Sequence, residues 1–185
     1  CLNMLKTSRK SFRNIVGHVD GISDISKLSA WVSEQFDPKL SWEDVARIRD
    51  WWGGKFIIKG IMEPEDASEA IKIGADAIIV SNHGGRQLDE ASSSISMLPS
   101  IVSEVGGKVS VWMDGGIRSG QDMLKAIALG AEITLVGRSF CYGIGAHGTE
   151  GGKKALNILH QELDMTMALC GHRDIREVDH SILKF

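Results

Sequence analysis

The pattern of hydrophobic and polar positions changes at about residue 41. Before it, residues 1–25 show little periodicity, and a short amphipathic stretch follows at residues 28–36. After it, continuous apolar runs, typical of strands buried on both faces, occur at residues 55–59, 77–81, 109–113 and 133–136. Apolar residues at helical spacing occur at residues 41–52, 65–73, 92–105, 121–129 and 157–169. The pattern therefore predicts one helix followed by four strand–helix units.

Start and stop signals support these helices. Ser41 precedes the first helical segment and Asp44 stands three residues later, the arrangement of a capping box. Pro64 opens and Gly74 closes the next helix. Pro99 lies inside the third helical segment, where we expect it to begin a second turn or to kink the helix.

Repeated strand–helix units with apolar strands predict a parallel α/β sheet covered by helices. A doubly wound sheet and a (β/α)8 TIM barrel both fit that description. The barrel is favoured because the units are short, and because polar residues follow every strand at the end where barrel enzymes place their chemistry. Glycine-containing turns after the last two strands indicate strands 7 and 8, so the four strands would be strands 5–8. A whole barrel needs ~250 residues, so we expect half of one.

Composition narrows the class of protein. The 185 residues carry 21 Lys and Arg against 24 Asp and Glu, a formal charge of −3 that gives no indication of nucleic-acid binding. No apolar run approaches the ~18 residues of a spanning helix, and no histidine pair has the spacing of a metal site. Three cysteines without motif spacing favour a reducing compartment. We expect Cys141, Cys170, Trp51 and Trp52 to be buried packing residues.

The segment Ser81–Asp89, SNHGGRQLD, is the most specific in the chain. His83 directly follows a predicted strand, and the pair Gly84-Gly85 lets the backbone turn tightly and approach a ligand. Histidine suits base catalysis near neutral pH, and the planar fork of Arg86 matches a carboxylate. Together they suit an acid with a reactive C–H or O–H beside its carboxylate. The alternative is a surface loop with a structural histidine and a solvated arginine.

Two further strand ends carry glycine and arginine. The segment Asp114–Gly120, DGGIRSG, offers backbone N–H groups, the charge of Arg118 and the start of the following helix, all of which attract an anion. The segment Val136–Arg138 repeats the arrangement after the last strand. Each could be an ordinary turn, but together they indicate a phosphate site. Because Asp114 would suit hydroxyl groups, a phosphorylated polyol is expected, either flavin mononucleotide (FMN) or a sugar phosphate.

Lys59 ends the first predicted strand. It is either a lysine that leaves the core at a strand terminus or a cation placed against negative charge that develops on a ligand. The residue alone does not decide between these two interpretations.

These segments resemble the FMN-dependent L-2-hydroxy acid dehydrogenase and oxidase family, and within it the bacterial quinone-linked L-lactate dehydrogenases. The similarity lies in Leu40–Ile61, Ser81–Asp89, Trp112–Ala131, Val136–Gly143 and Leu163–Gly171. It implies a TIM barrel, an FMN cofactor and oxidation of a short L-2-hydroxy acid, with L-lactate favoured. It also implies that residues 1–40 are the variable loop after strand 4, and that residues 41–185 are the C-terminal half of the barrel with its tail.

The resemblance implies a role for each motif residue. His83 would remove a proton from the substrate and Arg86 would bind its carboxylate, while the route by which the α-hydrogen leaves stays open. Lys59 would lie beside flavin N1 and O2, and Ser81 would touch the flavin. The ribityl chain and phosphate would be held by Asp114, Gly115, Gly116, Ile117 and Arg118, with Gly137 and Arg138 completing the phosphate site.

The resemblance also implies partners and a location. Electrons would pass to a quinone or another acceptor, and the enzyme would be a homo-oligomer, a tetramer in this family. The N-terminal half of the family's barrel has no counterpart here, so we expect the chain alone to be inactive. We expect a cytoplasmic location or peripheral attachment to the inner face of the cell membrane, which Trp31 and Phe36 would suit.

Two other functions remain open. Other flavin barrels, such as relatives of isopentenyl diphosphate isomerase or inosine monophosphate dehydrogenase, share a phosphate cradle, but the pair of His83 and Arg86 argues against them. A half-barrel could also assemble with another half and have a structural role without catalysis.

Overall fold

The computed structural model describes residues 15, 25–35 and 37–184. By its internal contacts the chain divides into two compact units, Cys1–Asp44 and Val45–Phe185. The first unit contains helix α2 (Ile25–Glu34), on which Leu28 is buried. The predictions for the other N-terminal residues and for Phe36 lie outside the described part of the chain.

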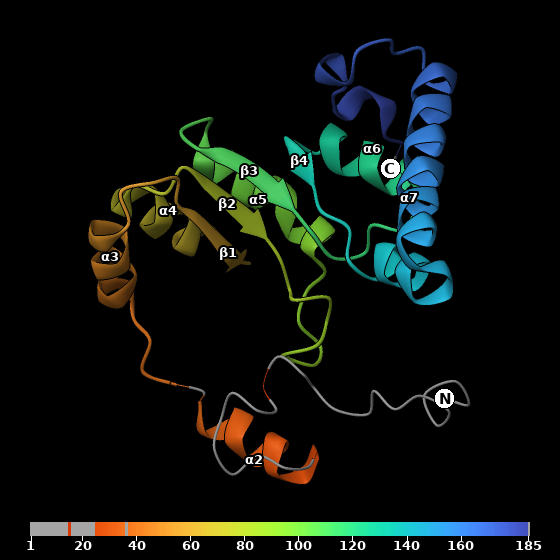
Figure 1. Ribbon diagram of the computed structural model, residues 1–185. Coiled ribbons are helices and arrows are strands. Elements are labelled where there is room, and N and C mark those ends of the chain that lie inside the picture. Colours follow the sequence, from red (N-terminus) through yellow and green to blue (C-terminus); the bar gives the residue numbers. More distant parts are fainter. Residues whose placement is uncertain (1–14, 16–24, 36, 185) are drawn as a thin grey trace. The chain divides into compact units, whose positions relative to one another are not determined.

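The second unit alternates helices and strands in the predicted order (Figure 1). In chain order the elements are α3 (Trp42–Trp51), which crosses the boundary between the units, β1 (Ile57–Ile61), α4 (Pro64–Ile73), β2 (Ala77–Val80), α5 (Ser94–Val105), β3 (Ser110–Met113), α6 (Gly120–Ala128), β4 (Ile133–Thr134), α7 (Arg138–Leu169) and the 3-10 turns η1 (Ile175–Glu177) and η2 (His180–Ile182).

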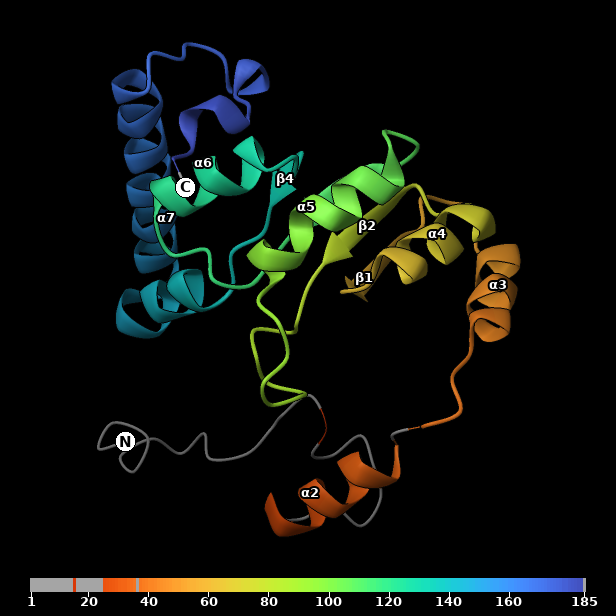
Figure 2. The same ribbon diagram turned by 180° about the vertical axis from the view of Figure 1, so that it is seen from behind.

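The four strands form one parallel sheet in the order β1-β2-β3-β4. Helices α4 and α5 cover the same face: they lie behind the strands in Figure 1 and in front of them in Figure 2. A doubly wound sheet reverses its strand order at a switch point and has helices on both faces. Strands added one after another, with these helices on one side, have the arrangement of consecutive barrel strands.

The helix ends use the signals seen in the sequence. At the start of α3, the carboxylate of Asp44 accepts a hydrogen bond from the backbone N–H of Ser41 at 2.9 Å, so the predicted capping box is confirmed. Pro64 is at the start of α4, and Gly74 ends that helix with φ +83°, a conformation that glycine adopts without strain. These caps fix the residues at which the helices begin and end, and therefore where the next strand can start.

The centre of the sheet is buried and its edges are exposed. All four residues of β2 are buried, and α5 contributes the fully buried Leu98 and Ile101 to the adjoining core. At the two edges, Ile57 of β1 is 40% exposed and Ile133 of β4 is 44% exposed. Exposed apolar side chains on edge strands are expected of a strip taken from a larger parallel sheet.

The apolar face of α3 is also exposed. Trp51 is 80% exposed and Trp52 is 57% exposed, so the prediction that they pack in the core is wrong. The helical spacing itself is correct, since α3 forms as predicted. Apolar periodicity shows that a face can be buried, and it does not show that the covering element belongs to the same chain.

Strand β1 begins two residues later than predicted, at Ile57 rather than Lys55. The carboxylate of Asp76 explains the shift, because it accepts hydrogen bonds from Lys55 Nζ at 2.6 Å and from the backbone N–H of Phe56 at 2.9 Å. The same two hydrogen bonds lower the pKa of Asp76. The backbone N–H of Asp76 also donates to the carbonyl oxygen of Phe56 at 2.8 Å, so the side-chain bonds add to the backbone pairing just before β1.

Helix α7 is much longer than the helix predicted at residues 157–169. Its backbone is non-helical at His147 and Gly148, so two helices meet at that point. They approach closely at glycines: a Cβ on Gly143 would lie 2.5 Å from the carbonyl oxygen of Gly151. The first of these two helices was not predicted because it is rich in glycine, which has low helix propensity. Here the glycines allow the backbones of the two helices to contact each other.

Smaller differences concern single residues. Strand β4 ends at Thr134, earlier than predicted, and α5 continues through Pro99 rather than starting a new turn there. Cys141 and Cys170 are exposed, so the prediction that they are buried is wrong; both lie at the ends of α7, where little covers them. No helix among the described residues is long and apolar enough to cross a membrane.

Candidate active site

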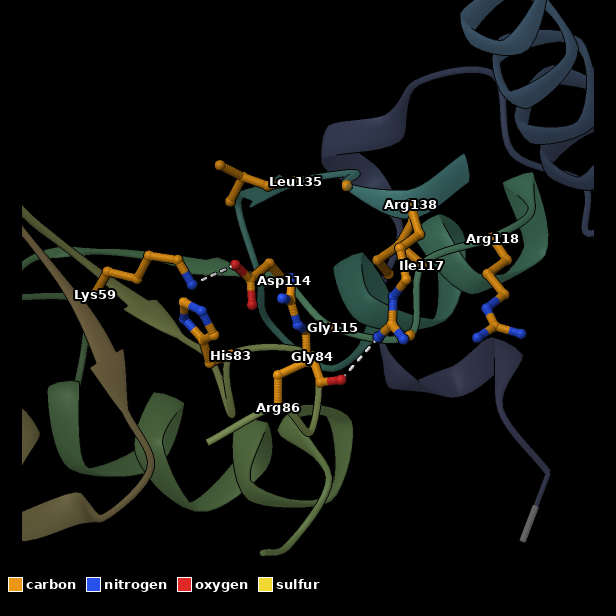
Figure 3. Close-up of a pocket in the computed structure, with 12 residues that line it drawn as sticks. Lys59, His83, Gly84, Arg86, Asp114, Gly115, Ile117, Arg118, Leu135 and Arg138 are labelled. Carbon is orange, nitrogen blue, oxygen red and sulfur yellow. Dashed lines mark hydrogen bonds and ion pairs between the residues drawn. The ribbon is translucent and has the colours of Figure 1, made fainter. Parts of the chain in front are cut away.

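A pocket of about 240 Å³ opens beside the carboxyl ends of the strands (Figure 3). It is lined by Lys59, His83, Gly84, Arg86, Asp114, Gly115, Gly116, Ile117, Arg118, Leu135, Gly137 and Arg138. The structure thus brings together residues from four strand ends. Ser81 is the one predicted site residue that does not line the pocket.

A bulge in β1 directs Lys59. The pairing of β1 with β2 shifts between Lys59 and Ile61, and the intervening Gly60 has φ +100°. Bulges of this kind re-aim side chains beside functional sites. Lys59 Nζ lies 2.6 Å from Asp114 Oδ2 and donates to Ser81 Oγ at 2.5 Å. Since an ammonium has three donors, one N–H of Lys59 remains for a ligand.

Ser81 supports two site residues from below the surface. Its side chain is buried, and its hydroxyl oxygen accepts hydrogen bonds from Lys59 Nζ and from the backbone N–H of His83. Because it is buried, its observed contribution is to hold Lys59 and His83. The contact between Ser81 and a flavin stays a prediction.

The loop after β2 has an unusual backbone. His83, Gly84 and Gly85 follow one another with φ angles of +57°, +69° and +69°. The left-handed region costs a residue with a Cβ ~1–2 kcal/mol, so the conformation of His83 has to be held by its surroundings. The backbone N–H of Gly85 donates to the backbone carbonyl and to the side chain of Asn82, at 3.0 and 3.2 Å. From the other side, Arg138 Nη2 donates to the carbonyl oxygen of Gly84 at 2.8 Å.

The backbone of the loop after β3 suits the binding of an anion, and this loop is named the anion cradle. Gly115 and Gly116 have φ angles of +86° and +84°. The backbone N–H groups of Gly116 and Ile117 meet no acceptor among the described residues. Ile117 is itself buried, which anchors the turn. Two free N–H groups on a fixed turn suit a phosphate oxygen.

The two helices that begin at the pocket differ in their free donors. At the start of α6, Ser119 and Asp122 form a capping box, and Gly120 donates its N–H to Glu162 at 2.9 Å. Glu162 and the Ser119 hydroxyl thus occupy the N–H groups of Gly120 and Asp122, so this helix start has fewer free donors for an anion, and its contribution to anion binding stays a prediction. Helix α7, by contrast, starts after Gly137 with no side-chain cap. Its first N–H groups are therefore the helix donors that an anion can use.

The pocket fits a phosphorylated polyol. The free N–H groups and the guanidinium groups of Arg118 and Arg138 suit the phosphate. Asp114 Oδ1 is buried and has no hydrogen-bond partner among the described residues, so it can accept from a hydroxyl group. Leu135 adds apolar surface. These features match FMN. No group of three metal-ligating side chains converges in the described part of the chain.

Sequence reasoning missed three residues that shape the site. Leu135 lines the pocket, Asn82 ties the turn after β2, and Glu162 caps α6. Leu135 lies in an apolar run that was predicted as a strand, and Asn82 lies inside the most specific motif, so the sequence contained a signal from which both could have been found. Glu162 had none, because it reaches α6 from a helix 42 residues further along the chain.

Comparison with known proteins identifies the family. Residues 3–185 match the model of the family described as FMN-dependent dehydrogenase. An L-lactate dehydrogenase of Actinobacillus pleuropneumoniae serotype 5b (strain L20) is 41% identical over 179 residues, which are 97% of this chain and 47% of that protein. An L-lactate dehydrogenase of Haemophilus influenzae (strain ATCC 51907 / DSM 11121 / KW20 / Rd) is 46% identical over 148 residues, 80% of this chain and 39% of that protein.

Solved structures give the same result. A monotopic membrane protein, (S)-mandelate dehydrogenase, matches with a TM-score of 0.82 and 39% identity, over 90% of this chain and 44% of that one. A mandelate oxidase variant with a monooxide FMN adduct matches with a TM-score of 0.71 and 45% identity, over 74% of this chain and 43% of that one. The chain spans about half the length of the curated relatives it matches.

Proposed function

The chain belongs to the FMN-dependent dehydrogenase family, and we propose that it forms the C-terminal half of a TIM barrel that oxidises a short L-2-hydroxy acid, with L-lactate favoured. The observation that carries this proposal is one pocket that joins His83 and Arg86 to an anion cradle. The pocket volume of about 240 Å³ is below the ~300–1,000 Å³ of small-molecule sites. A site that lacks one wall explains the difference, and the N-terminal half of the barrel would supply that wall.

His83 and Arg86 divide the work on the substrate. Arg86 binds the carboxylate with its planar fork and fixes the orientation of the α-carbon. His83 accepts the proton that the substrate loses, either from the hydroxyl group or from the α-carbon. Both side chains are exposed at the pocket, so they can reach a substrate that enters it. FMN, when bound, would take up the two electrons and the second hydrogen that leave the substrate.

The remaining site residues hold the cofactor. The N–H groups of Gly116 and Ile117, the start of α7 and the two cradle arginines bind the phosphate. Asp114 accepts from a ribityl hydroxyl with its free oxygen and keeps Lys59 in place with the other. Lys59 presents its ammonium to the flavin ring, where it stabilises negative charge.

We favour L-lactate over mandelate as the substrate. The curated relatives at 41–46% identity are named L-lactate dehydrogenases. The structural relatives are mandelate enzymes at 39–45% identity. Mandelate carries a phenyl group where lactate carries a methyl group, so the residues around that group decide the choice. We place them in the missing half, because the pocket in this chain is dominated by polar groups and glycines.

The chain alone is expected to be inactive. Its sheet has two edges with exposed isoleucines, and a closed barrel has no edges.

Residues 1–40 would be the variable loop after strand 4. The complete enzyme would be a homo-oligomer that passes electrons to a quinone or another acceptor. A structural relative described as a monotopic membrane protein supports peripheral attachment to a membrane; co-sedimentation with lipid vesicles would test this.

The proposed function is tested on the complete barrel, with the N-terminal half present, and on residues 1–185 alone. The complete protein should contain stoichiometric flavin, and L-lactate should bleach its absorbance without oxygen, whereas D-lactate should not. The same chain without its N-terminal half should show no turnover. Bleaching by mandelate but not by L-lactate would correct the substrate. Stoichiometric flavin that no 2-hydroxy acid bleaches would reject the function.

A further inference from the structure

The side chain of Arg138 connects the start of α7 to the loop after β2, which carries His83. Its Nη2 donates to the carbonyl oxygen of Gly84 at 2.8 Å, across 54 residues of sequence. Figure 3 shows this bond running from the start of α7 to the turn that carries His83. Arg118, the other cradle arginine, makes no such bond among the described residues, and its side chain lies on the far side of Arg138 from Gly84 in this view.

The bond falls on the strained part of the loop. Gly84 is the middle one of three successive residues with left-handed backbone angles, and the first of them is His83. The hydrogen bonds that His83 and Gly85 donate to Ser81 and Asn82 hold the loop only at its beginning. In the part of the chain that the structure describes, the bond to Arg138 is the one hydrogen bond that ties residues 83–90 to a distant element.

We propose that Arg138 is a positioning residue for His83 as well as a ligand of the cofactor phosphate. This inference rests on the proposed function. A guanidinium has five N–H donors in a rigid plane, so one of them can hold Gly84 while others meet a phosphate. A bound phosphate fixes the guanidinium, and the guanidinium then fixes the Gly84 carbonyl and the backbone of His83. Binding of the cofactor therefore orders the base.

The coupling has to work in both directions. If the phosphate orders the loop, a well-placed loop strengthens the binding of phosphate by the same factor. Changes in the loop that displace Arg138 should therefore weaken FMN binding, although the loop itself does not line the cradle for the phosphate.

Hydrogen exchange tests the first direction in the complete protein, measured with and without FMN. FMN should slow the exchange of the amides of residues 83–90 roughly ten-fold or more, the factor expected for one hydrogen bond to a charged group. Arg138→Lys keeps the charge and loses the planar fork, so it should bind FMN but lose this protection. Arg118→Lys makes the same change in the other cradle arginine and should keep the protection.

Two alanine variants test the reverse direction. Gly84 and Gly85 have the same φ angle of +69°, so both substitutions strain the backbone alike. Only at Gly84 would a Cβ meet Arg138, at 2.9 Å from Nη2, whereas nothing lies within 4 Å of a Cβ at Gly85. Gly84→Ala should therefore weaken FMN binding roughly ten-fold more than Gly85→Ala does.

The outcomes separate this inference from the proposed function. A wild-type complete protein that binds no FMN contradicts both. If FMN binds and the exchange of residues 83–90 does not change, the positioning role is wrong and the proposed function stands. The same conclusion follows if the two arginine variants are equally protected, or if the two alanine variants bind FMN equally.

Discussion

The loops after β2 and β3 contain the same residue types but are held in different ways. Each has two glycines with positive φ angles and an arginine that lines the pocket. The β3 loop is short, passes into a capped helix and is anchored by the buried Ile117. The β2 loop is long and exposed, and its far side is held by Arg138. A rigid turn suits the permanent binding of a cofactor, whereas a loop with fewer anchors suits a base that must meet a substrate.

The largest effect should come from the β2 loop. His83→Gln in the complete protein should lower turnover roughly 10²–10⁴-fold, the contribution of a general base. Flavin content should stay at the wild-type level, because the cradle lies in the other loop. Turnover is measured per bound flavin, and a variant with near-normal turnover would remove His83 from the role of base.

Arg86→Lys should have the next largest effect. A lysine keeps the positive charge but cannot form the two parallel hydrogen bonds of the guanidinium. We expect kcat/KM for L-lactate to fall roughly ten-fold or more, mainly through a higher KM. Steady-state kinetics measure this, and unchanged values of KM and kcat would contradict the carboxylate role. The affinity of this variant for FMN should equal that of the wild-type protein.

A change in the β3 loop should have the opposite profile. Arg118→Ala should weaken FMN binding by about 1.5–3 kcal/mol, the range for a hydrogen bond to a charged group. Arg173→Ala removes the same charge from an exposed position that does not line the pocket, and it controls for net charge. Equilibrium titration with FMN measures both. Equal affinities for the two variants would place the phosphate elsewhere.

The smallest effect concerns the anchor of the β3 loop. Ser119 caps α6 and Ser93 caps α5 in the same way, by accepting a backbone N–H three residues on. Either serine changed to alanine should cost ~1 kcal/mol of the free energy of unfolding. Only Ser119→Ala should also weaken FMN binding, because its cap fixes the cradle. Denaturant unfolding and flavin titration measure the two quantities, and equal flavin affinities would show that the cap does not support the cradle.

The strand–helix order could be read from the sequence because buried parallel strands and capped helices leave strong local signals. β2 is apolar throughout, and the capping box of Ser41 is confirmed. Resemblance to a known family supplied the family and the cofactor, and both are confirmed by the comparisons. The individual roles of His83, Arg86 and Lys59 stay predictions.

Other features depend on contacts between distant segments, which local patterns do not record. The capping of α6 by Glu162 and the bond from Arg138 to Gly84 each join residues more than forty positions apart. Exposure of Trp51 could not be predicted, because its periodicity gives no information on whether a covering element is present. The glycines around Gly143 were misleading for a related reason: they allow a close helix contact that their low propensity conceals.

The division of work between the two loops is tested most directly by comparing riboflavin with FMN, since riboflavin differs only in lacking the phosphate. The measurement is the dissociation constant of riboflavin divided by that of FMN, both determined in the complete protein. Arg118→Ala should reduce that ratio roughly ten-fold or more by weakening FMN binding alone, and His83→Gln should leave the ratio unchanged. A ratio that stays constant in Arg118→Ala, or that falls in His83→Gln, would contradict the assignment of phosphate binding to the β3 loop.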